Sequence, residues 1–513
     1  MYGEEKLNTH NLLRYGLTKE FFEQFHAIRH KGIEIPLTLI RPFHVYIKKF
    51  INGQMTSPSY VAKIKGNHKL VTMRDVQSAL LRKPKIQRDL SKVSRRTTTI
   101  MPAKLIDFAL DKMVNQAVIL VVADRHDRAA LKGKRLPRNF KLFNYIKAIR
   151  AQRISPKITR KLKRSIRQLT VKNGGHPIFG TRKFSKWLYA QSVKSIKTIN
   201  ALENLIRKKP VGVLIDHVEI VNPGTTFALL ANKFNLPFIN FPQLLIADRS
   251  LIPTRASYHF VWGKNYKEWL ERRGIHSGKI IITGNLRFEH AKQEVPSTKE
   301  KFLARSNVPT NHTIVLYTTQ PFEASVSNEI MRWISSASNH SQPVTFLIKP
   351  HPNDTVDYSK YTASPQVKLL SKDAGLYDAL SSADIVMTIS SNTAIEAAML
   401  DKAIIVLQPP IPYNYDHHNN DFNQHLVTAS AGLVARNSKQ LSSYVSKFIR
   451  SEALRNLLVK QSKQFLSNTL QTSKSPADEA FKMIRNLISQ KSSTSSAVRP
   501  KRTRKRKLRR RRK

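Results

Sequence analysis

Short apolar runs rich in β-branched residues recur along this chain, and each ends at a polar residue or a turn. In the first half, such runs occupy residues 117–123, 211–215, 237–241, 258–262 and 279–282. A continuous apolar run of this length is typical of a strand that is buried on both faces of a sheet. Segments of helical pattern lie between several of the runs, as at residues 225–234. The spacing therefore predicts parallel β-α-β units.

The same alternation restarts after a polar segment at residues 289–312, which contains Pro296 and Pro309 and is predicted to link two domains. Strands are expected at residues 313–317, 344–348, 367–370, 384–387 and 403–407. Helices are expected at residues 325–337, 375–382, 393–400 and through much of 438–489. The sequence thus predicts an α/β protein with two Rossmann-like, doubly wound domains and a cleft between them.

Four segments follow from this pattern. They are a basic N-terminal region of unknown role (1–100), a first Rossmann-like domain with a basic insertion (101–288), a second Rossmann-like domain (289–490) and a basic tail (491–513). Fragments at residues 38–40 and 45–47 fit either short strands or helices. The tail carries 11 Lys or Arg within residues 501–513. A block of like charge cannot pack, so we expect the tail to be disordered.

Charge and composition limit the class of protein. The chain of 513 residues has 88 Lys and Arg against 34 Asp and Glu, a formal net charge of +54, which attracts polyanions. It has no cysteine, which excludes disulfides, thiolate metal sites and a cysteine nucleophile. No apolar run approaches the roughly 18 residues of a membrane-spanning helix, and the first residues lack a signal-peptide core. We therefore expect a cytoplasmic protein.

The basic tail has two possible partners. Lys501–Lys513 can hold the protein at the anionic inner face of a membrane, where each basic residue contributes about 1 kcal/mol. It can also bind nucleic acid through counterion release. Nucleic acid is possible but not favoured, because no nucleic-acid-binding motif is present and aromatic residues do not alternate with the basic runs.

Polar residues gather where three predicted strands of the second domain end. Ligands of parallel α/β sheets bind at the carboxyl ends of the strands, so these residues are expected to share one crevice. The predicted binding residues are Thr318, Thr319, Lys349, His351, Ser390, Ser391, Asn392, Thr393 and Glu396.

Each of these residue types suits a phosphorylated ligand, and each also has a structural alternative. Ser391, Asn392 or Thr393 can cap the next helix and leave its first N–H groups to bind a phosphate. Glu396 can accept from a ribose or sugar hydroxyl, or can complete a capping box. His351 lies between two prolines, where it can bind a diphosphate together with Lys349, exchange a proton, or serve only in a turn.

Two stretches carry a resemblance to a known family. Lys-Pro-His-Pro at residues 349–352 and LSSADIVMTISSNTAIEAAMLDKAII at residues 380–405 resemble the donor domain of GT-B glycosyltransferases. The most similar groups are the CDP-glycerol glycerophosphotransferases and the capsule-polysaccharide and polysialic-acid transferases. The resemblance covers about residues 210–440. Many relatives have Gln-His-Gly after the strand that corresponds to 237–241, where this chain reads FPQLL.

The resemblance implies a transferase with two functional halves. The second domain would bind a nucleotide-activated donor, with His351 and the 390–393 turn near its phosphates. The first domain would bind a polymer or lipid-linked acceptor, such as a capsule polysaccharide or a teichoic-acid-like polymer, and a sugar or polyol-phosphate group would be transferred. No cofactor and no metal ion are predicted, and the His- and Asp-containing segment 413–421 is expected to be a donor-side loop.

An inverting transfer needs a base on the acceptor side. Asp216 and His217 end a predicted strand and are the preferred catalytic candidates, together with His351 on the donor side. Glu219, Asp124 and Asp127 are alternatives, and each can equally be an ordinary polar group at a strand end. Two other functions remain open: a polyanion-binding protein on a degenerate transferase scaffold, and a nucleotide-sugar epimerase, which shares the two-domain fold.

Overall fold

The computed structural model describes residues 6–90, 93, 96–243, 248–291, 297–338, 342–411 and 425–493. Three predicted features lie partly or wholly outside these residues. They are the end of the FPQLL stretch, the loop at 413–421 and the basic tail from residue 494 onward.

The first domain is built on a sheet of seven parallel strands, in the order β5-β4-β3-β6-β7-β8-β9. The strands are β3 (Thr98–Pro102), β4 (Val118–Val122), β5 (Phe140–Asn144), β6 (Val211–Asp216), β7 (Phe238–Asn240), β8 (Tyr258–Val261) and β9 (Ile280–Ile282). The five runs predicted in this half are confirmed as β4 and β6–β9. Every residue of β4 and β6 is buried, as expected for a sheet covered on both faces.

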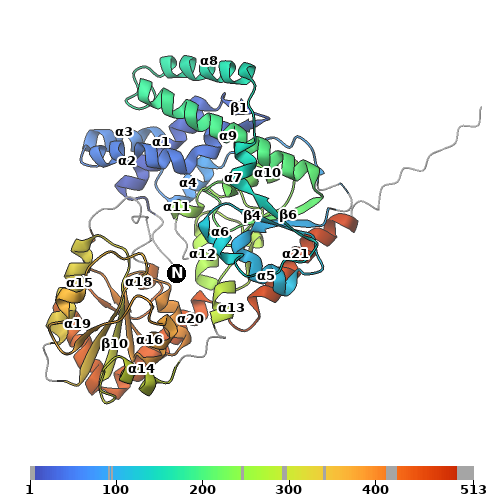
Figure 1. Cartoon of the computed structure of the whole chain (residues 1–513). Coiled ribbons are helices and arrows are strands. Elements are labelled where there is room, and N and C mark those ends of the chain that lie inside the picture. The colour runs from blue at the N-terminus through green and yellow to red at the C-terminus, as the bar shows by residue number, and fades with distance from the viewer. Residues whose placement is uncertain are drawn as a thin grey trace, which may run out of the picture.

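Helices cover both faces of this sheet (Figure 1). They include α5 (Ile106–Lys112), α6 (Arg125–Ala130), α7 (Tyr145–Arg150), α10 (Gly224–Phe234), α11 (Asp248–Leu251), α12 (Lys264–Arg272) and α13 (Leu286–Ala291). Short 3-10 turns, η3 (Ala103–Leu105) and η4 (Ser277–Lys279), follow β3 and precede β9.

The second domain has a sheet of six parallel strands, in the order β12-β11-β10-β13-β14-β15. The strands are β10 (Thr313–Thr318), β11 (Val344–Lys349), β12 (Val367–Leu369), β13 (Ile385–Thr388), β14 (Ala403–Leu407) and β15 (Leu433–Ala435). Its helices are α14 (Lys299–Arg305), α15 (Ala324–Ser338), α16 (Leu376–Ser382), α17 (Thr393–Met399), α18 (His425–Thr428), α19 (Ser438–Arg450) and α20 (Glu452–Thr469), with the 3-10 turn η5 (Ser359–Tyr361). The α/β class and the two Rossmann-like domains are confirmed.

Both sheets reverse their strand order at one point. In the first sheet the chain runs outward from β3 to β5, and then returns to the other side of β3 with β6. In the second sheet it runs outward from β10 to β12, and returns beside β10 with β13. The connections diverge on the two sides of such a switch point and leave a crevice at the carboxyl ends of the strands.

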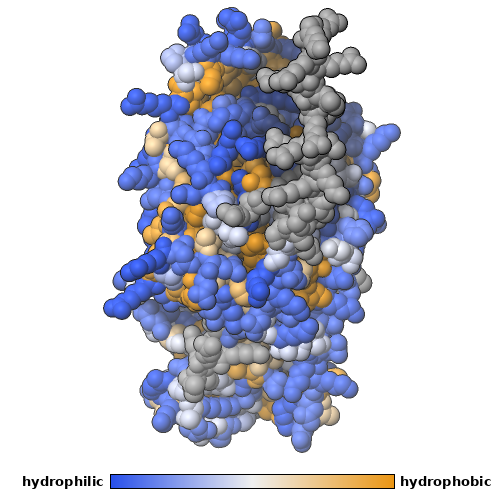
Figure 2. Space-filling view, turned by 90° about the vertical axis from the view of Figure 1, so that its right-hand side faces the viewer, coloured by the Kyte–Doolittle hydropathy of each residue, from blue (hydrophilic) through white to orange (hydrophobic). Residues whose placement is uncertain are grey.

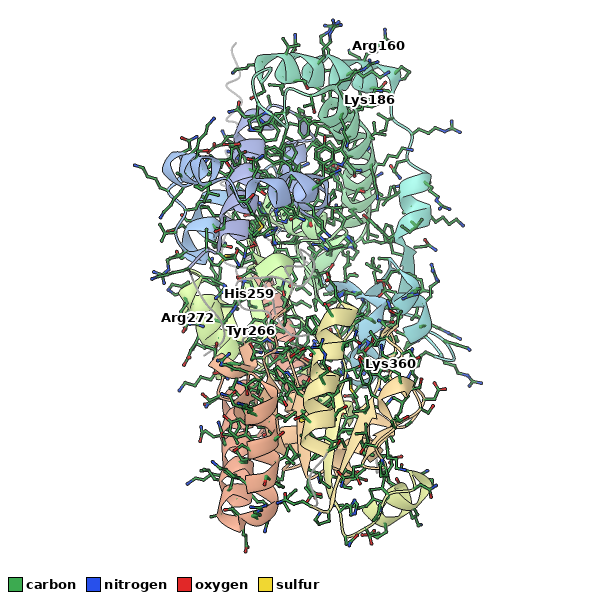
Figure 3. The ribbon with its side chains drawn as sticks, turned by 90° about the vertical axis from the view of Figure 1, so that its left-hand side faces the viewer. Arg160, Lys186, His259, Tyr266, Arg272 and Lys360 are labelled. Carbon is green, nitrogen blue, oxygen red and sulfur yellow. The ribbon has the colours of Figure 1, made fainter. Side chains whose placement is uncertain are left out.

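The N-terminal region and the basic insertion form one helical layer on the first domain (Figure 1). It contains α1 (Thr9–Phe25), α2 (Ile40–Gln54), α3 (Pro58–His68), α4 (Met73–Leu80), α8 (Pro156–Lys172) and α9 (Arg182–Lys208), with a short hairpin of β1 (Arg29–His30) and β2 (Ile33–Glu34) and the 3-10 turn η1 (Ile35–Leu39). Phe21 of α1 stacks on Phe43 of α2 with ring centroids 4.3 Å apart, and meets Phe184 of α9 edge-on at 6.0 Å. The fragments predicted around residues 38–47 are therefore helical. Arg160 and Lys186 lie on the outer part of this layer (Figure 3).

The last helix, α21 (Pro476–Ser493), packs on the first domain, although it was predicted to belong to the second. Its Ala480 and Ile484 are buried in a cluster with Met101 of β3 and Val213 of β6, so α21 covers the first sheet and not the second (Figure 1). A helical pattern in the sequence indicates an apolar face but not which sheet that face covers. The chain therefore passes from the first domain to the second after α13 and returns to the first domain after α20.

Figure 2 shows hydrophilic side chains over most of the face it presents, with apolar side chains in several separate places. Among the described residues, no helix combines the length and apolar character that are needed to cross a membrane.

Candidate functional site

The carboxyl ends of β10 and β13, which flank the second switch point, are joined by side-chain hydrogen bonds. The hydroxyl oxygens of Thr318 and Thr393 lie 2.7 Å apart. The amide of Gln320 accepts from the Ser390 backbone N–H at 2.9 Å and donates to the Ser390 hydroxyl at 3.2 Å. Thr318, Ser390, Thr393 and the intervening Ser391 and Asn392 therefore lie together, as predicted. Gln320 was not among the predicted binding residues, although it directly follows Thr319.

His351 joins this group from the end of β11. Its backbone N–H donates to the Thr319 hydroxyl at 2.9 Å, and its Nδ1 accepts from the Asn353 N–H at 3.1 Å. Burial lowers the pKa of His351, Asp354 opposes this effect and Lys349 adds to it. A neutral imidazole whose Nδ1 accepts carries its proton on Nε2. His351 thus offers an Nε2–H donor. We call the carboxyl ends of β10, β11 and β13, together with residues 388–393, the strand-end cluster.

The buried carboxylate of Asp354 supports the strand-end cluster through hydrogen bonds. Asp354 is 1% exposed, and it accepts from the Thr319 hydroxyl at 2.5 Å and the Tyr358 hydroxyl at 2.7 Å. Because the Thr319 oxygen also accepts from the His351 N–H, the threonine connects Asp354 to His351. Both predicted threonines, Thr318 and Thr319, are buried and their hydroxyls are used within the protein. They position the cluster.

Lys349 and Glu396 differ from their predicted roles. The Lys349 ammonium donates to the backbone carbonyls of Ser371 and Lys372, at 3.3 and 2.7 Å, and so holds the loop after β12. Glu396 is fully buried, and its Oε1 lies 3.1 Å from Arg287 Nη2 of α13. This ion pair joins α17 to the carboxyl edge of the first sheet. Both side chains therefore make contacts within the protein in this conformation.

The predicted helix cap at residues 391–393 also takes a different form. Asn392 precedes α17 with helical backbone angles and makes no side-chain cap. The Ser391 hydroxyl accepts from the Thr393 N–H at 3.2 Å instead. Glu396 therefore completes no capping box, because no reciprocal partner is present.

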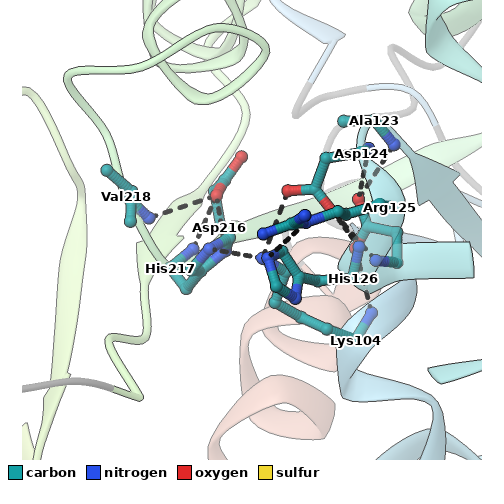
Figure 4. A network of polar contacts seen from close by, with 9 residues as sticks. Lys104, Ala123, Asp124, Arg125, His126, Asp216, His217 and Val218 are labelled. Atoms are coloured by element: carbon teal, nitrogen blue, oxygen red, sulfur yellow. Dashed lines mark hydrogen bonds and ion pairs between the residues drawn. The ribbon is translucent and has the colours of Figure 1, made fainter. Parts of the chain in front are cut away.

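Asp216 and His217 lie at the first switch point, at the carboxyl end of β6 (Figure 4). Asp216 is 5% exposed, and its Oδ1 accepts from the backbone N–H of His217 at 2.7 Å and of Val218 at 3.2 Å. The His217 Nδ1 lies 3.1 Å from the same oxygen, although it is not aligned as a hydrogen bond. The His217 Nε2 lies 3.0 Å from the Lys104 Nζ. The three side chains thus form one continuous chain of contacts.

These residues line a cavity of about 150 Å³ between the ends of β3, β4 and β6, which we call the Asp216 cavity. Lys104 enters it from η3, and its ammonium also lies 3.7 Å from Asp124 Oδ2. Sequence reasoning missed Lys104, because β3 itself was not predicted. Gly224 begins α10 here, and a Cβ at this position would lie 2.5 Å from the Val218 carbonyl oxygen and 3.0 Å from Asp216 Oδ2. The close approach of this helix therefore requires glycine.

Asp124 and Asp127 also line the cavity, and Asn240 lies on the neighbouring strand β7. Asp124 and Asp127 form a reciprocal capping box on α6. Both therefore have a structural role at the end of β4, which was the alternative to a role as the base. Asn240 ends β7 in register with Asp216, is fully buried, and neither its amide nitrogen nor its oxygen has a hydrogen-bond partner within the described residues. An unsatisfied buried amide is uncommon and is often found at functional sites. No described group of three or more His, Cys, Asp or Glu residues is arranged to hold a metal ion.

Glu219, the remaining alternative for the base, lies outside the cavity. It is 1% exposed and accepts from the Thr254 hydroxyl and the Arg255 N–H, both at 2.5 Å. Burial raises the pKa of Glu219 from 4.5 to about 7, although these hydrogen bonds and the Arg255 charge oppose the change. Its role is structural.

This pKa predicts a pH-dependent stability. Between pH 4.5 and about 7 the unfolded chain releases the Glu219 proton while the folded chain retains it, so the free energy of unfolding falls as pH rises through this window. At about 1.4 kcal/mol per pH unit, the loss is on the order of 3 kcal/mol. Urea unfolding from pH 4.5 to 8 should show this slope in the wild type and lose it in Glu219→Gln. The exposed Glu300→Gln should keep it, and equal slopes in all three proteins would refute the assignment.

Comparison with known proteins gives one family. The family model described as UDP-N-acetylglucosamine 2-epimerase matches residues 247–453, which covers α11 to the start of α20. A search of curated proteins gives no significant match. The fold is GT-B-like, with two facing Rossmann-like domains and a last helix that returns to the first. The narrower resemblance to CDP-glycerol and capsule transferases stays a prediction.

Solved structures of similar architecture cover about three quarters of the chain. A glycosyltransferase from Rickettsia africae ESF-5 is 12% identical, covers 77% of this chain and 99% of its own, and has a TM-score of 0.47. The UDP-GlcNAc 2-epimerase from Neisseria meningitidis bound to UDP-GlcNAc is 15% identical, with 77% and 99% coverage and a TM-score of 0.46. The UDP-GlcNAc 2-epimerase from Methanocaldococcus jannaschii is 14% identical, with 76% and 99% coverage and a TM-score of 0.46.

Proposed function

We propose that this protein is an enzyme that acts on a nucleotide-activated sugar or polyol and transfers the activated group to a hydroxyl of an acceptor. One observation carries the proposal. In each domain, the group of polar side chains best suited to the reaction lies at the switch point of the sheet. Switch points are where parallel α/β domains bind their ligands. The Arg287–Glu396 ion pair connects the carboxyl edges of the two domains, as a shared site requires.

The strand-end cluster would bind the diphosphate of the donor. The His351 Nε2–H is a neutral donor that can bond a phosphate oxygen. The backbone of the 388–393 turn is held by Gln320 at the end of the neighbouring strand β10. Lys349 would make no direct contact with the phosphates in this conformation, because its ammonium is held by backbone carbonyls. The binding energy would come from hydrogen bonds of fixed direction, which cost little reorganisation when the donor enters.

The Asp216 cavity would activate the acceptor. In the free protein the Lys104 ammonium can donate to the His217 Nε2, which leaves the imidazole proton on Nδ1, beside Asp216. An acceptor hydroxyl that takes the place of Lys104 at Nε2 could pass its proton to His217, and Asp216 would stabilise the imidazolium that forms. Lys104 would remain close to the developing negative charge.

A second candidate is epimerisation at a carbon of the sugar ring, which the family match over residues 247–453 favours. Such a reaction needs no acceptor and leaves the nucleotide attached to the sugar. Incubation with UDP-N-acetylglucosamine alone distinguishes the epimerase from the transferase. A new epimer without acceptor supports the epimerase, whereas release of the nucleotide only when an acceptor is added supports the transferase. The acceptor polymer and membrane attachment through residues 501–513 also stay predictions.

His351→Ala should remove most of the donor affinity. A ligand present at about 100 times its Kd stabilises a protein by about 2.7 kcal/mol, which thermal unfolding detects readily. UDP-, CDP-, GDP- and CMP-linked donors should be compared, and the donor that stabilises the wild type should no longer stabilise the variant.

His312→Ala is the matched control, because His312 belongs to the same domain but precedes β10 and bonds Thr345 at the opposite edge of the sheet. It should respond to the donor as the wild type does. Equal stabilisation of wild type and His351→Ala would remove His351 from the site. A wild type that no nucleotide stabilises would reject the enzymatic function.

A further inference from the structure

A larger cavity, of about 570 Å³, opens on the first domain away from both switch points. Its walls are α4 with residues 81–83, the segment 254–256 before β8, and the turn between α12 and β9 at residues 271–279. We call it the Lys83 cavity. The residues that matter most in its lining are Arg74, Lys83, Arg255, His259, Glu271 and Lys279.

The Lys83 cavity lies at the opposite edge of the sheet from the Asp216 cavity. His259 is the second residue of β8 and Lys279 directly precedes β9, so both lie at the amino ends of their strands. Asp216 and His217 lie at the carboxyl end of β6. Four residues of β8 span roughly 13 Å at about 3.3 Å each, which separates the two edges. His259 and Arg272 are labelled in Figure 3.

The positive charges at the rim of this cavity have no ion-pair partner within the described part of the chain, whereas the buried Arg255 of the lining lies near Glu219 and Glu34. Arg74, Lys83 and Lys279 are exposed at its rim, and none of them lies within ion-pair distance of a described carboxylate. The Arg74 guanidinium donates to the backbone carbonyls of Arg272 and Glu271, which fixes its position. Glu271 is the acidic residue of the lining, and its carboxylate lies 3.9 Å from Lys267, outside the cavity. A concave surface with charge of one sign concentrates the field that attracts an anion.

His259 adds a buried polar group in the same cavity. It is 2% exposed, and its Nδ1 has no hydrogen-bond partner within the described residues. Burial and the Lys279 charge lower the pKa of His259 to about 3, so the ring is neutral and can still donate one hydrogen bond. Burial, Lys279 and Arg255 also lower the pKa of Lys83, and Glu219 opposes this change. Lys83, Lys279 and Arg255 repel one another, and a bound anion would offset that repulsion.

We propose that the Lys83 cavity is a second ligand site, which binds the phosphate group of a phosphorylated sugar or polyol. Lys83, Lys279 and Arg74 supply charge-assisted hydrogen bonds, and His259 supplies a neutral contact at the base. The cavity is larger than a phosphate ion needs and falls in the size range of small-molecule sites. Its lining includes no Phe, Tyr or Trp that could stack on a nucleobase, so a nucleotide fits less well.

Calorimetric titration of the full chain with inorganic phosphate and with glucose 6-phosphate tests the site. Lys83→Ala/Lys279→Ala should weaken binding about tenfold or more. The control Lys157→Ala/Lys161→Ala removes the same charge from exposed positions on α8 and should bind as the wild type does. Equal affinity in the two double variants, or no saturable binding by the wild type, would overturn the proposal.

The ligand class and the independence of the site need two further comparisons. Tighter binding of glucose 6-phosphate than of inorganic phosphate supports the ester, whereas equal binding assigns the cavity to free phosphate and overturns the sugar or polyol part of the proposal. The His351→Ala variant should keep this binding even if it loses the nucleotide donor. Loss of phosphate binding in His351→Ala, with retention in Lys83→Ala/Lys279→Ala, would place the phosphate in the second domain and reject the Lys83 cavity.

Discussion

His217→Asn should lower turnover by about 10²–10⁴-fold and leave the affinity for the nucleotide donor unchanged. The imidazole is the group in the Asp216 cavity that can both accept a proton and receive support from a carboxylate, since Asp216 Oδ1 lies 3.1 Å from its Nδ1. Asparagine keeps a hydrogen-bonding side chain of similar reach but cannot take the proton. Steady-state product formation with the donor identified by thermal unfolding provides the measurement.

His126→Asn is the control for this experiment. His126 is an exposed histidine close to the same cavity (Figure 4), and its ring does not line it. A small effect there and a large effect at His217 would support the role of the base. Equal, modest effects at both positions would exclude His217, and Asp216→Asn would then show whether the carboxylate itself accepts the proton.

Asp354→Ala should destabilise the protein by about 3–4 kcal/mol. The substitution leaves the Tyr358 hydroxyl without its buried acceptor, takes away one partner of Thr319 and opens a small void. Because Thr319 also holds the His351 backbone, the donor site should loosen together with the fold. Urea unfolding gives the stability change, and donor titration below the unfolding transition gives the change in affinity.

Asp357→Ala separates this effect from a general loss of charge. Asp357 lies three residues farther along, is exposed, and bonds only Ser359 at the surface. Its replacement should change the unfolding free energy by about 0.5 kcal/mol or less. A similarly small change in Asp354→Ala would mean that Thr319 and Tyr358 find other partners, and that the carboxylate does not support the cluster.

The strands that the sequence predicts are those whose burial on both faces leaves an uninterrupted apolar run, such as β4 and β6. Strand β5 was not predicted, because it is an edge strand and has no continuous apolar run. Its Leu142 is 54% exposed, and polar residues alternate with the apolar ones. Strand β3 begins with Thr98 and Thr99, which are buried but polar. Without β3 there was no reason to place Lys104 at a strand end.

For the proposed donor site, the sequence predicts which strand ends carry the polar residues, but it does not predict what their side chains contact. His351 and the 390–393 turn had to lie at the same edge of the sheet, because parallel strands all end there, and β10 lies between the strands that they follow. The orientation of Lys349 depends on the carbonyls of residues 371 and 372, which the path of the loop after β12 brings near. The partner of Glu396 is Arg287, which lies 109 positions away in the sequence and in the other domain. Such contacts depend on how the domains pack.

The return of α21 to the first sheet means that neither half of this protein can be obtained by cutting the chain once. A fragment ending near residue 290 would expose the surface around Met101 and Val213 that Ala480 and Ile484 cover, while the complementary fragment would carry an apolar helix with nothing to cover it. The two domains should therefore unfold cooperatively.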